Sequence, residues 1–280
     1  MNRANRKDRQ KKFYINSVKD LRRPMFPIPR ITESFVDSMA QNLGWRRYLE
    51  AHTPTEGRLN ADYLANNAII ELKIMEEEGL DKESRQAKLA KLFSQVHPNA
   101  SQIDVTFENV PASITREVQA IVSMPIQSAV KKASRQIAHS TEDLGRDNDD
   151  GVLLIVNNGY SYLNAENFER LVVQRCRNDS NHIDYAFCVT VDYHQGDFDS
   201  YIFLTARCNT IQGEATWDLA DAVADRFQAR FNDAMGQMIS DQMNPEFWRN
   251  RLPPVTDILF EKDGVKYIRK APEVRDSRFS

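Results

Sequence analysis

The sequence predicts an α/β protein with a mixed central sheet flanked by helices. Amphipathic helical patterns alternate along the chain with short strand-like runs, which is typical of this class. The run at residues 152–156 is wholly apolar, as expected of a strand that is buried on both faces. With 280 residues, 41% of them hydrophobic, the chain can bury a core around such a sheet without cross-links.

The first elements are a capped helix and a hairpin. Thr32 is typical of a helix N-cap, apolar residues follow it at helical spacing, and Gly44 ends the helix. Two strand-like runs, 62–65 and 68–73, then flank Asn66-Asn67. Asparagine tolerates the positive φ angles of a two-residue turn, so these runs predict a β-hairpin.

The remaining elements follow from the same helical and strand periodicities. Pro125 separates two helical patterns, and Asp263-Gly264 marks the turn of a last hairpin. The elements predicted between these landmarks and around them are a helix at 81–96, a strand at 103–107, helices at 113–124 and 126–142, the buried strand at 152–156, a helix at 165–177, strands at 183–192 and 200–207, and a helix at 215–242.

Positive charge is concentrated at the start of the chain. The whole chain has a net charge of -3, but residues 1–30 hold ten Lys or Arg against two Asp, so the remainder carries a net negative charge. We therefore expect a basic N-terminal arm over 1–31, a core over 32–160 and a C-terminal extension over 161–280 that packs on the core. A basic composition is typical of a segment that contacts nucleic acid, although a solvated tail has the same composition.

The cysteines and the hydropathy pattern bear on the compartment. Cys176, Cys188 and Cys208 are odd in number and far apart, which favours a reducing compartment. No run approaches the roughly 20 apolar residues of a membrane helix, and no apolar segment follows the first charged residues. We therefore expect a cytoplasmic protein that does not associate with a membrane.

The hairpin predicts a cluster of charged side chains on one face. A two-residue turn places Asp62 opposite Glu71, with Cβ atoms about 4.5–5.5 Å apart, and Lys73 points to the same side. Two opposed carboxylates repel each other, and a divalent cation offsets that repulsion. Because hard oxygen ligands suit Mg²⁺ or Mn²⁺, the pair predicts a site for one of these ions.

An ammonium group beside such a metal site favours hydrolysis of a phosphodiester. Lys73 can orient a water or stabilise charge on a phosphoryl oxygen. The alternative is a solvated strand face on which the two acids and the lysine coexist without a function. The opposed acids and the apolar reverse face of the hairpin favour the functional interpretation.

The hairpin resembles the active-site motif of the PD-(D/E)xK, or restriction-endonuclease-like, nuclease superfamily, with Asp62 on one strand and Glu71-Leu72-Lys73 on the next. The resemblance implies a restriction-endonuclease-like core, and Mg²⁺ (or Mn²⁺) bound by Asp62, Glu71 and the Leu72 carbonyl. It also implies that Lys73 lies at the attacking water. Ala61 stands where the family often has proline, which shapes the turn but carries no chemistry.

Two flanking helices extend the resemblance. Many members of the superfamily have a helix with a glutamate ahead of the motif, and Glu33 is the candidate here. Many also have a later helix with a glutamine before a buried strand, and Gln136 is the candidate, with Gln86 as the alternative. The resemblance thus adds Glu33 and Gln136 to the catalytic site, and residues 74–125 form an insertion before the glutamine helix.

These features predict a metal-dependent nuclease that hydrolyses phosphodiester bonds of nucleic acid. DNA is the expected substrate, and defence, restriction or repair is the expected role. The alternative is a catalytically silent nuclease-like fold that binds nucleic acid or protein within a larger complex. A homo-oligomer and a complex with a partner protein are both compatible with the sequence.

Overall fold

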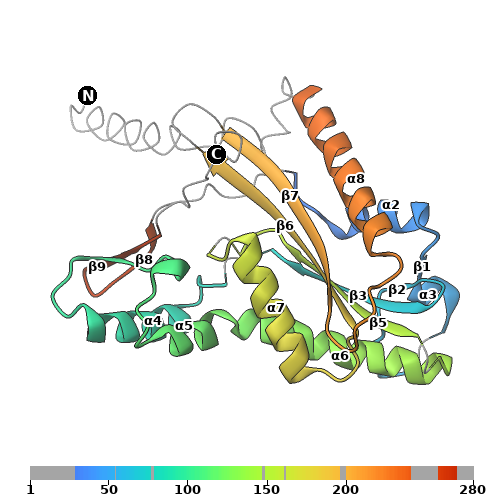
Figure 1. Cartoon of the computed structure of the whole chain (residues 1–280), viewed down its shortest axis with the longest axis horizontal. Helices are drawn as coiled ribbons and strands as arrows, with labels where there is room; N and C mark the ends of the chain where they lie inside the picture. Colours follow the sequence, from blue (N-terminus) through green and yellow to red (C-terminus); the bar gives the residue numbers. More distant parts are fainter. Residues whose placement is uncertain are drawn as a thin grey trace, which may run out of the picture.

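The computed structural model describes residues 29–53, 55–76, 79–146, 149–160, 162–195, 200–240 and 258–269. Most of the predicted basic arm, residues 1–28, lies outside the described residues. The described elements form a mixed sheet with helices on both faces, and a smaller second sheet (Figure 1). The predicted mixed sheet flanked by helices is therefore confirmed.

The central sheet has six strands, and its inner pairs are parallel. β3–β5 and β5–β6 are parallel, whereas β1–β2, β2–β3 and β6–β7 are antiparallel. The last two strands come from the predicted C-terminal extension and complete the sheet at one edge. In their order across the sheet the strands are β1 (Arg46–Arg47), β2 (Tyr63–Leu64), β3 (Ala68–Met75), β5 (Asp150–Asn157), β6 (Tyr185–Gln195) and β7 (Ser200–Thr210).

The β2–β3 hairpin has the register that the Asn66-Asn67 turn predicts. Tyr63 pairs with Ile70, and the N–H of Ala65 donates to the carbonyl oxygen of Ala68 at 2.9 Å. β2 has two residues and β3 has eight, so β3 continues well past the end of β2. This difference in length matters for the site, because it leaves one edge of β3 to be satisfied by side chains.

Helices cover both faces of the sheet. α6 (Met124–Leu144) and α7 (Ala165–Asp179) pack on one face, and α2 (Glu33–Asn42) and α8 (Ala220–Ser240) pack on the other (Figure 1). The Thr32 hydroxyl accepts a hydrogen bond from the N–H of Phe35 at 3.2 Å, and Gly44 follows α2 with φ +73°. The predicted cap and the predicted end of this helix are thus confirmed. A single turn, α3 (Tyr48–Ala51), leads from β1 towards β2.

α5 (Thr115–Val122) and α6 meet at Ser123 and not at Pro125. The predicted break at Pro125 is wrong, because α6 already begins at Met124 and contains the proline in its first turn. Proline is tolerated there, since an N–H at that position would have no intrahelical acceptor. α8 likewise begins at Ala220, five residues later than the predicted start.

The smaller sheet joins two distant parts of the chain. β4 (Gln102–Asp104), in the predicted insertion, pairs in parallel with β9 (Val265–Ile268), which forms a hairpin with β8 (Ile258–Lys262). The last predicted hairpin is therefore confirmed. The strand predicted at 103–107 ends early, because Asp104 Oδ1 accepts a hydrogen bond from the Thr106 N–H at 2.9 Å and a 3₁₀ turn (Phe107–Asn109) follows. α4 (Glu83–Val96) packs against α5 and β8.

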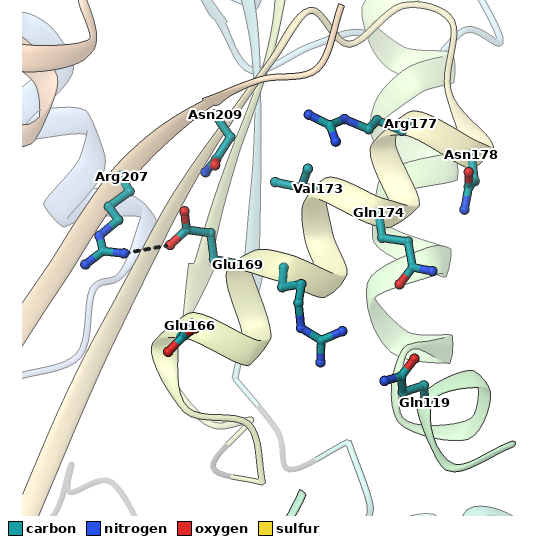
Figure 2. Close-up of a pocket in the computed structure, with 10 residues that line it drawn as sticks. Gln119, Glu166, Glu169, Val173, Gln174, Arg177, Asn178, Arg207 and Asn209 are labelled. Atoms are coloured by element: carbon teal, nitrogen blue, oxygen red, sulfur yellow. Dashed lines mark ion pairs between the residues drawn. The ribbon is translucent and has the colours of Figure 1, made fainter. Parts of the chain in front are cut away.

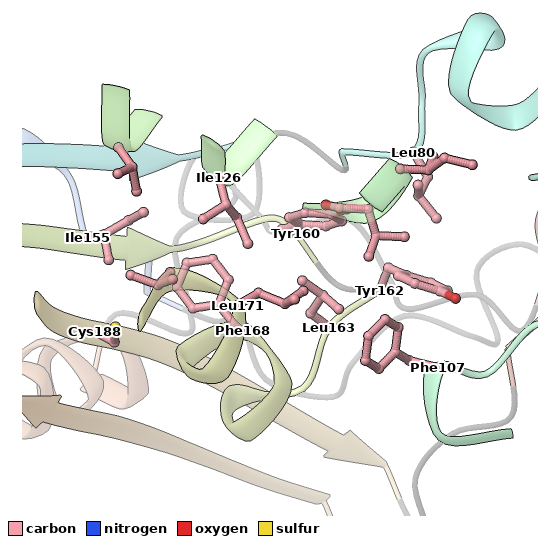
Figure 3. Close-up of a cluster of buried hydrophobic side chains, with 14 of the residues drawn as sticks. Leu80, Phe107, Ile126, Ile155, Tyr160, Tyr162, Leu163, Phe168, Leu171 and Cys188 are labelled. Atoms are coloured by element: carbon pink, nitrogen blue, oxygen red, sulfur yellow. The ribbon is translucent and has the colours of Figure 1, made fainter. Parts of the chain in front are cut away.

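The core beneath α6 and α7 extends towards this smaller sheet. Tyr160 and Tyr162, in the loop after β5, are buried, and their hydroxyl groups donate to the carbonyl oxygens of Val122 and Val105. Figure 3 shows both tyrosines among aliphatic and aromatic side chains from several elements. The hydroxyl donors let aromatic rings fill this region without leaving a buried polar atom unpaired. None of the helices in the described ranges is both long and apolar enough to cross a membrane.

Candidate active site

Asp62 directly precedes β2 and continues the pairing of that strand along the edge of β3. Its N–H donates to the carbonyl oxygen of Ile70 at 3.1 Å, and its Oδ2 accepts a hydrogen bond from the N–H of Leu72 at 2.8 Å. The side chain thus takes the place of the strand partner that Leu72 would have if β2 were longer. Because backbone groups of alternate strand residues point to the same edge, the Leu72 carbonyl faces the side on which Asp62 lies.

Glu71 and Lys73 lie on the face of β3 that α6 covers. Glu71 is 0% exposed, and 16% of the Lys73 side chain is exposed. The Lys73 ammonium forms an ion pair with Oε1 of Glu71. Ile70 and Leu72 are buried on the opposite face, so β3 is covered on both sides. The acid-bearing face of the hairpin is therefore not a solvated surface.

Gln136 reaches this ion pair from the middle of α6. Its Oε1 accepts a hydrogen bond from the Lys73 ammonium at 3.0 Å, and its Nε2 donates to the carbonyl oxygen of Asn60 at 2.9 Å. The amide therefore ties the lysine to the segment that leads into Asp62. Gln86, the alternative glutamine, lies on α4, which packs mainly against α5 and β8.

Burial controls the protonation of the two acids. Burial and the negative charge of Asp62 raise the pKa of Glu71 to about 8. Burial also raises the pKa of Asp62, against the hydrogen bond from Leu72 and the charge of Lys73. The Oε2 atom of Glu71 is buried and has no described donor while both acids are ionised, whereas Asp62 and Glu71 share a side-chain hydrogen bond when one of them holds a proton. An unpaired buried carboxylate oxygen is costly, so this pair favours either a bound proton or a bound cation.

Arg47 links the helix glutamate to the acid pair, and it is not among the residues predicted from the sequence. Its guanidinium lies 2.6 Å from Oε1 of Glu33, 2.6 Å from Oδ1 of Asp37 and 3.8 Å from Oδ1 of Asp62. Glu33 is thus connected to Asp62 through Arg47. No spacing in the sequence indicates this arginine, because it is brought to the acids by the pairing of β1 with β2.

Several contacts hold Arg47 in this position. Its two hydrogen bonds to Asp37 are bidentate, at 2.6 and 2.8 Å, and its guanidinium lies 4.6 Å from the ring centroid of Tyr63. The Tyr63 hydroxyl also donates to Oδ1 of Asp37 at 2.8 Å. The hydrogen bond from Arg47 holds the pKa of Asp37 below its usual value. A bidentate pair of this kind fixes the direction of the guanidinium as well as its distance.

The residues at the end of β2 suit a hard divalent cation. Asp62, Glu71 and the Leu72 carbonyl supply oxygen donors, and water completes the shell of Mg²⁺ or Mn²⁺ in most protein sites. The unpaired Oε2 of Glu71 is the observation that fits such an ion. Among the described residues there is no ready cluster of three or more His, Cys, Asp or Glu side chains. The donor set therefore depends on the backbone carbonyl as its third member.

A separate pocket lies at the other edge of the sheet. Its volume is about 520 Å³, and Figure 2 shows an ion pair in its lining between Arg207 of β7 and Glu169 of α7, which lie 3.5 Å apart. Its walls also carry Arg170, Arg177 and Glu166, so both charges are present. β7 is three strands from β3 in the sheet, and the pocket is therefore distinct from the candidate site.

The structure brings Asp62, Glu71, Lys73 and Gln136 together at one place, and it connects Glu33 to them through Arg47. These five side chains come from α2, the β2–β3 hairpin and α6, which are far apart in the sequence. The arrangement can hold a cation, hold a proton on a buried acid, and present an ammonium group beside both. No family model, no curated protein and no solved structure matches the chain.

Proposed function

We propose that this chain is a metal-dependent nuclease that hydrolyses phosphodiester bonds of nucleic acid, with DNA as its substrate. The observation that carries the proposal is the contact of the Lys73 ammonium with both Glu71 and Gln136, beside Asp62 and the open edge of β3. This contact forms only when the β2–β3 hairpin, the distant helix α6 and the buried parallel strand β5 are all in place. The hairpin, the glutamine-bearing helix and the buried strand follow one another in the order that the resemblance implies. This order supports a restriction-endonuclease-like core with the site on its hairpin.

Asp62, Glu71 and the Leu72 carbonyl are the residues that would hold Mg²⁺ or Mn²⁺. When bound, the ion lowers the pKa of a coordinated water and polarises a phosphoryl oxygen. The hydrogen bond from the Leu72 N–H to Asp62 Oδ2 fixes the carboxylate against the edge of β3. The raised pKa of Glu71 means that ligand binding at this acid displaces a proton, so cation affinity rises with pH.

Lys73 would act on the water or the phosphoryl group, and Gln136 would position Lys73. The Lys73 ammonium donates hydrogen bonds and can hold a water or neutralise charge on a phosphoryl oxygen. Gln136 limits the positions that the ammonium can take, because its Oε1 accepts from Nζ while its Nε2 is held by the Asn60 carbonyl. Arg47 is a positioning residue, since it reaches Asp62 at 3.8 Å while anchored on Asp37.

The second candidate is a catalytically silent nuclease-like fold that binds nucleic acid or protein. Its support is the complete burial of Glu71 and the direct ion pair that Lys73 makes with it. A buried ion pair of this kind can have a purely structural role, in which each charge is satisfied by the other inside the fold. The meeting of three oxygen donors, from Asp62, Glu71 and the Leu72 carbonyl, beside an ammonium group favours the metal-dependent candidate over this one.

A nicking assay separates the two candidates. Supercoiled plasmid is incubated with the purified full chain in Mg²⁺, in Mn²⁺ and in EDTA. The nuclease proposal predicts conversion to nicked or linear DNA with either metal and none in EDTA. A matched preparation of Glu71→Gln, which keeps the size of the side chain and removes its charge, controls for contaminating nucleases.

Equal conversion by Glu71→Gln and the parent would assign the activity to a contaminant. No conversion by a folded parent in either metal, with DNA and with RNA of the same sequence, would contradict the proposal and favour the silent fold. Conversion of RNA alone would keep the reaction and correct the substrate.

A further inference from the structure

α6 runs antiparallel to β3 across the face of the sheet that carries the candidate site. Gln136, in the middle of α6, accepts a hydrogen bond from Lys73, which lies near the end of β3. Arg146, just past the end of α6, donates to the carbonyl oxygen of Asn66, in the turn before β3. The residues that precede Gln136 on α6 therefore lie alongside the last part of β3, which extends beyond β2.

Three basic side chains lie beside Gln136 on α6. Lys132 precedes Gln136 by four residues and His139 follows it by three, so both share its side of the helix. His139 Nδ1 lies 3.3 Å from the carbonyl oxygen of Leu59, in the segment before β2. Arg135 lies further round the helix, towards solvent, and both Arg135 and Lys132 are exposed. Lys132 and Arg135 thus form a basic edge of α6 that borders the site on its solvent side.

No acid in the described part of the chain forms an ion pair with Lys132 or Arg135. Arg135 Nε donates to the carbonyl oxygen of Lys131 at 3.3 Å, which is a neutral acceptor on the same helix. Lys131 itself lies on the other shoulder of α6, where its ammonium is 3.5 Å from Oδ1 of Asp179 on α7. The two acids of α6 both pair with Arg58. The charge of the basic edge is therefore not neutralised within the described fold.

The basic edge suits a polyanion that approaches the candidate site. The chain has a net charge of -3, and the carboxylates of the site repel an anion, so attraction must come from cations close by. Lys132 and Arg135 are three residues apart, about 4.5 Å along the helix axis. Phosphates of one strand recur every ~3.4 Å along a duplex, so two long side chains at this spacing can each reach one. Such charge-assisted contacts are strong.

We propose that the basic edge, Lys132 and Arg135, binds the phosphate backbone of nucleic acid beside the candidate active site and so holds the strand against Lys73. The inference rests on the proposed function for its choice of ligand. It adds two exposed binding residues to the site, both of them outside the acid cluster. Contacts with phosphate carry no sequence information, so binding through this edge is independent of the base sequence.

Binding is measured without cleavage, by fluorescence anisotropy of a labelled duplex of about 20 base pairs in EDTA at several KCl concentrations. The double variant Lys132→Gln/Arg135→Gln should bind about a hundredfold more weakly than the parent at about 0.1 M KCl, which is about tenfold for each lost phosphate contact. Its plot of log affinity against log salt should be shallower by about 1.8, and that of each single variant by about 0.9.

Two further variants control for the loss of charge. Lys88→Gln/Lys91→Gln removes two exposed lysines at the same spacing from α4, which lies at the other end of the molecule from the β2–β3 hairpin (Figure 1). This variant should keep the affinity and the salt slope of the parent. Lys132→Arg/Arg135→Lys keeps both charges on the basic edge and should also bind like the parent. Thermal melts verify that every variant is folded.

The same duplex in RNA distinguishes the two sources of a phosphodiester backbone, because the duplex for which the double variant loses affinity is the one that contacts the basic edge. Parent-like affinity and salt slope in the double variant for both duplexes would overturn the inference, even if the parent cleaves DNA. So would an equal loss in the α4 control, or the absence of binding by the parent. A loss confined to the basic edge, in a parent that cleaves nothing, would support the inference and contradict the nuclease proposal. The two proposals therefore fail independently.

Discussion

The Lys73 ammonium lies 3.0 Å from Oε1 of Gln136, although the two residues are 63 positions apart in the sequence. This contact joins the hairpin that carries both acids to the long helix α6. A lysine on an exposed strand would have its charge solvated by water alone. Here the amide and Glu71 together hold the ammonium within a largely covered site, which is the condition under which a charged donor is effective in catalysis.

Gln136→Met should reduce the rate of metal-dependent cleavage at saturating substrate by about ten- to a hundredfold, the usual effect of removing a group that orients a ligand or donor. KM should change little, because Gln136 acts on Lys73 and not on the bulk of the substrate. Gln136→Glu can still accept from the ammonium and should recover part of the rate. A parent-like rate in Gln136→Met would show that Lys73 needs no such partner.

Asp62→Asn should abolish metal binding without lowering the stability of the metal-free protein. Burial raises the pKa of Asp62, so its ionisation costs stability at neutral pH and the neutral amide relieves that cost. In EDTA the variant should melt at the parent temperature or slightly above it. In Mn²⁺ the parent should gain about 2.7 kcal/mol at a hundredfold excess over the dissociation constant, and the variant should gain none. Thermal melts of both proteins in the two buffers provide the comparison.

If the parent melts at the same temperature in EDTA and across millimolar Mn²⁺, Asp62 and Glu71 do not bind a metal ion. Lower stability of Asp62→Asn in EDTA would indicate instead that the carboxylate is a structural partner of Arg47 and Lys73.

Arg47→Met should destabilise the protein in a pH-dependent manner. The hydrogen bond from Arg47 holds the pKa of Asp37 below the usual 3.8, so the ionised acid stabilises the fold above that pH, and this contribution disappears as the pH falls through the lowered pKa. The parent should be more stable than the variant by about 1 kcal/mol at about pH 7, a modest value because the pair is partly exposed. The difference should decrease as the pH falls below 3.8 towards the lowered pKa.

Arg207→Met is the control for this measurement, because the Arg207 side chain is 63% exposed and its ion pair with Glu169 is longer, at 3.5 Å. Its variant should lose less stability than Arg47→Met. A stability difference between parent and Arg47→Met that stays constant from pH 7 to pH 3 in chemical denaturation would contradict the assigned role of Asp37.

Gly151→Ala should destabilise the buried end of β5. A Cβ atom there would overlap the carbonyl oxygen of His182, and the backbone of Gly151 is already held by Asp184 through hydrogen bonds of 2.7 Å at both its N–H and its carbonyl. The loss should reach about 3 kcal/mol, since a backbone atom cannot rotate out of the way. Gly236→Ala, in α8 with open space for a Cβ, should instead stabilise by about 1 kcal/mol. Equal melting temperatures of the two variants would contradict this explanation.

Local chemistry allowed part of the site to be predicted from the sequence. The Asn66-Asn67 turn has two residues, so the register that brings Asp62 towards Glu71 follows from counting, and the pairing of Tyr63 with Ile70 confirms that register. The N-cap at Thr32 is equally local, because its side chain and its acceptor are three residues apart. Such features depend on neighbouring residues only.

The other features depend on tertiary packing and have no signal in a single sequence. The burial of Glu71 requires α6 to cover β3, and strand alternation alone predicts a solvated acid there. The position of Arg47 depends on a two-residue strand, β1, that is too short to show a pattern. The pairing of β4 with β9 joins residues about 160 positions apart, so neither strand indicates its partner.

The rate of DNA cleavage by Lys73→Met shows whether the Lys73 ammonium takes part in catalysis. The substitution removes the ammonium and keeps a long, flexible side chain, and Lys91→Met, on the exposed side of α4, is the matched control. Both variants and the parent are assayed on labelled DNA in Mn²⁺ under single-turnover conditions, with circular dichroism to verify folding. If the ammonium takes part in catalysis, the parent and Lys91→Met should cleave at the same rate, and folded Lys73→Met should cleave at least about a hundredfold more slowly. A parent-like rate in folded Lys73→Met would contradict this role.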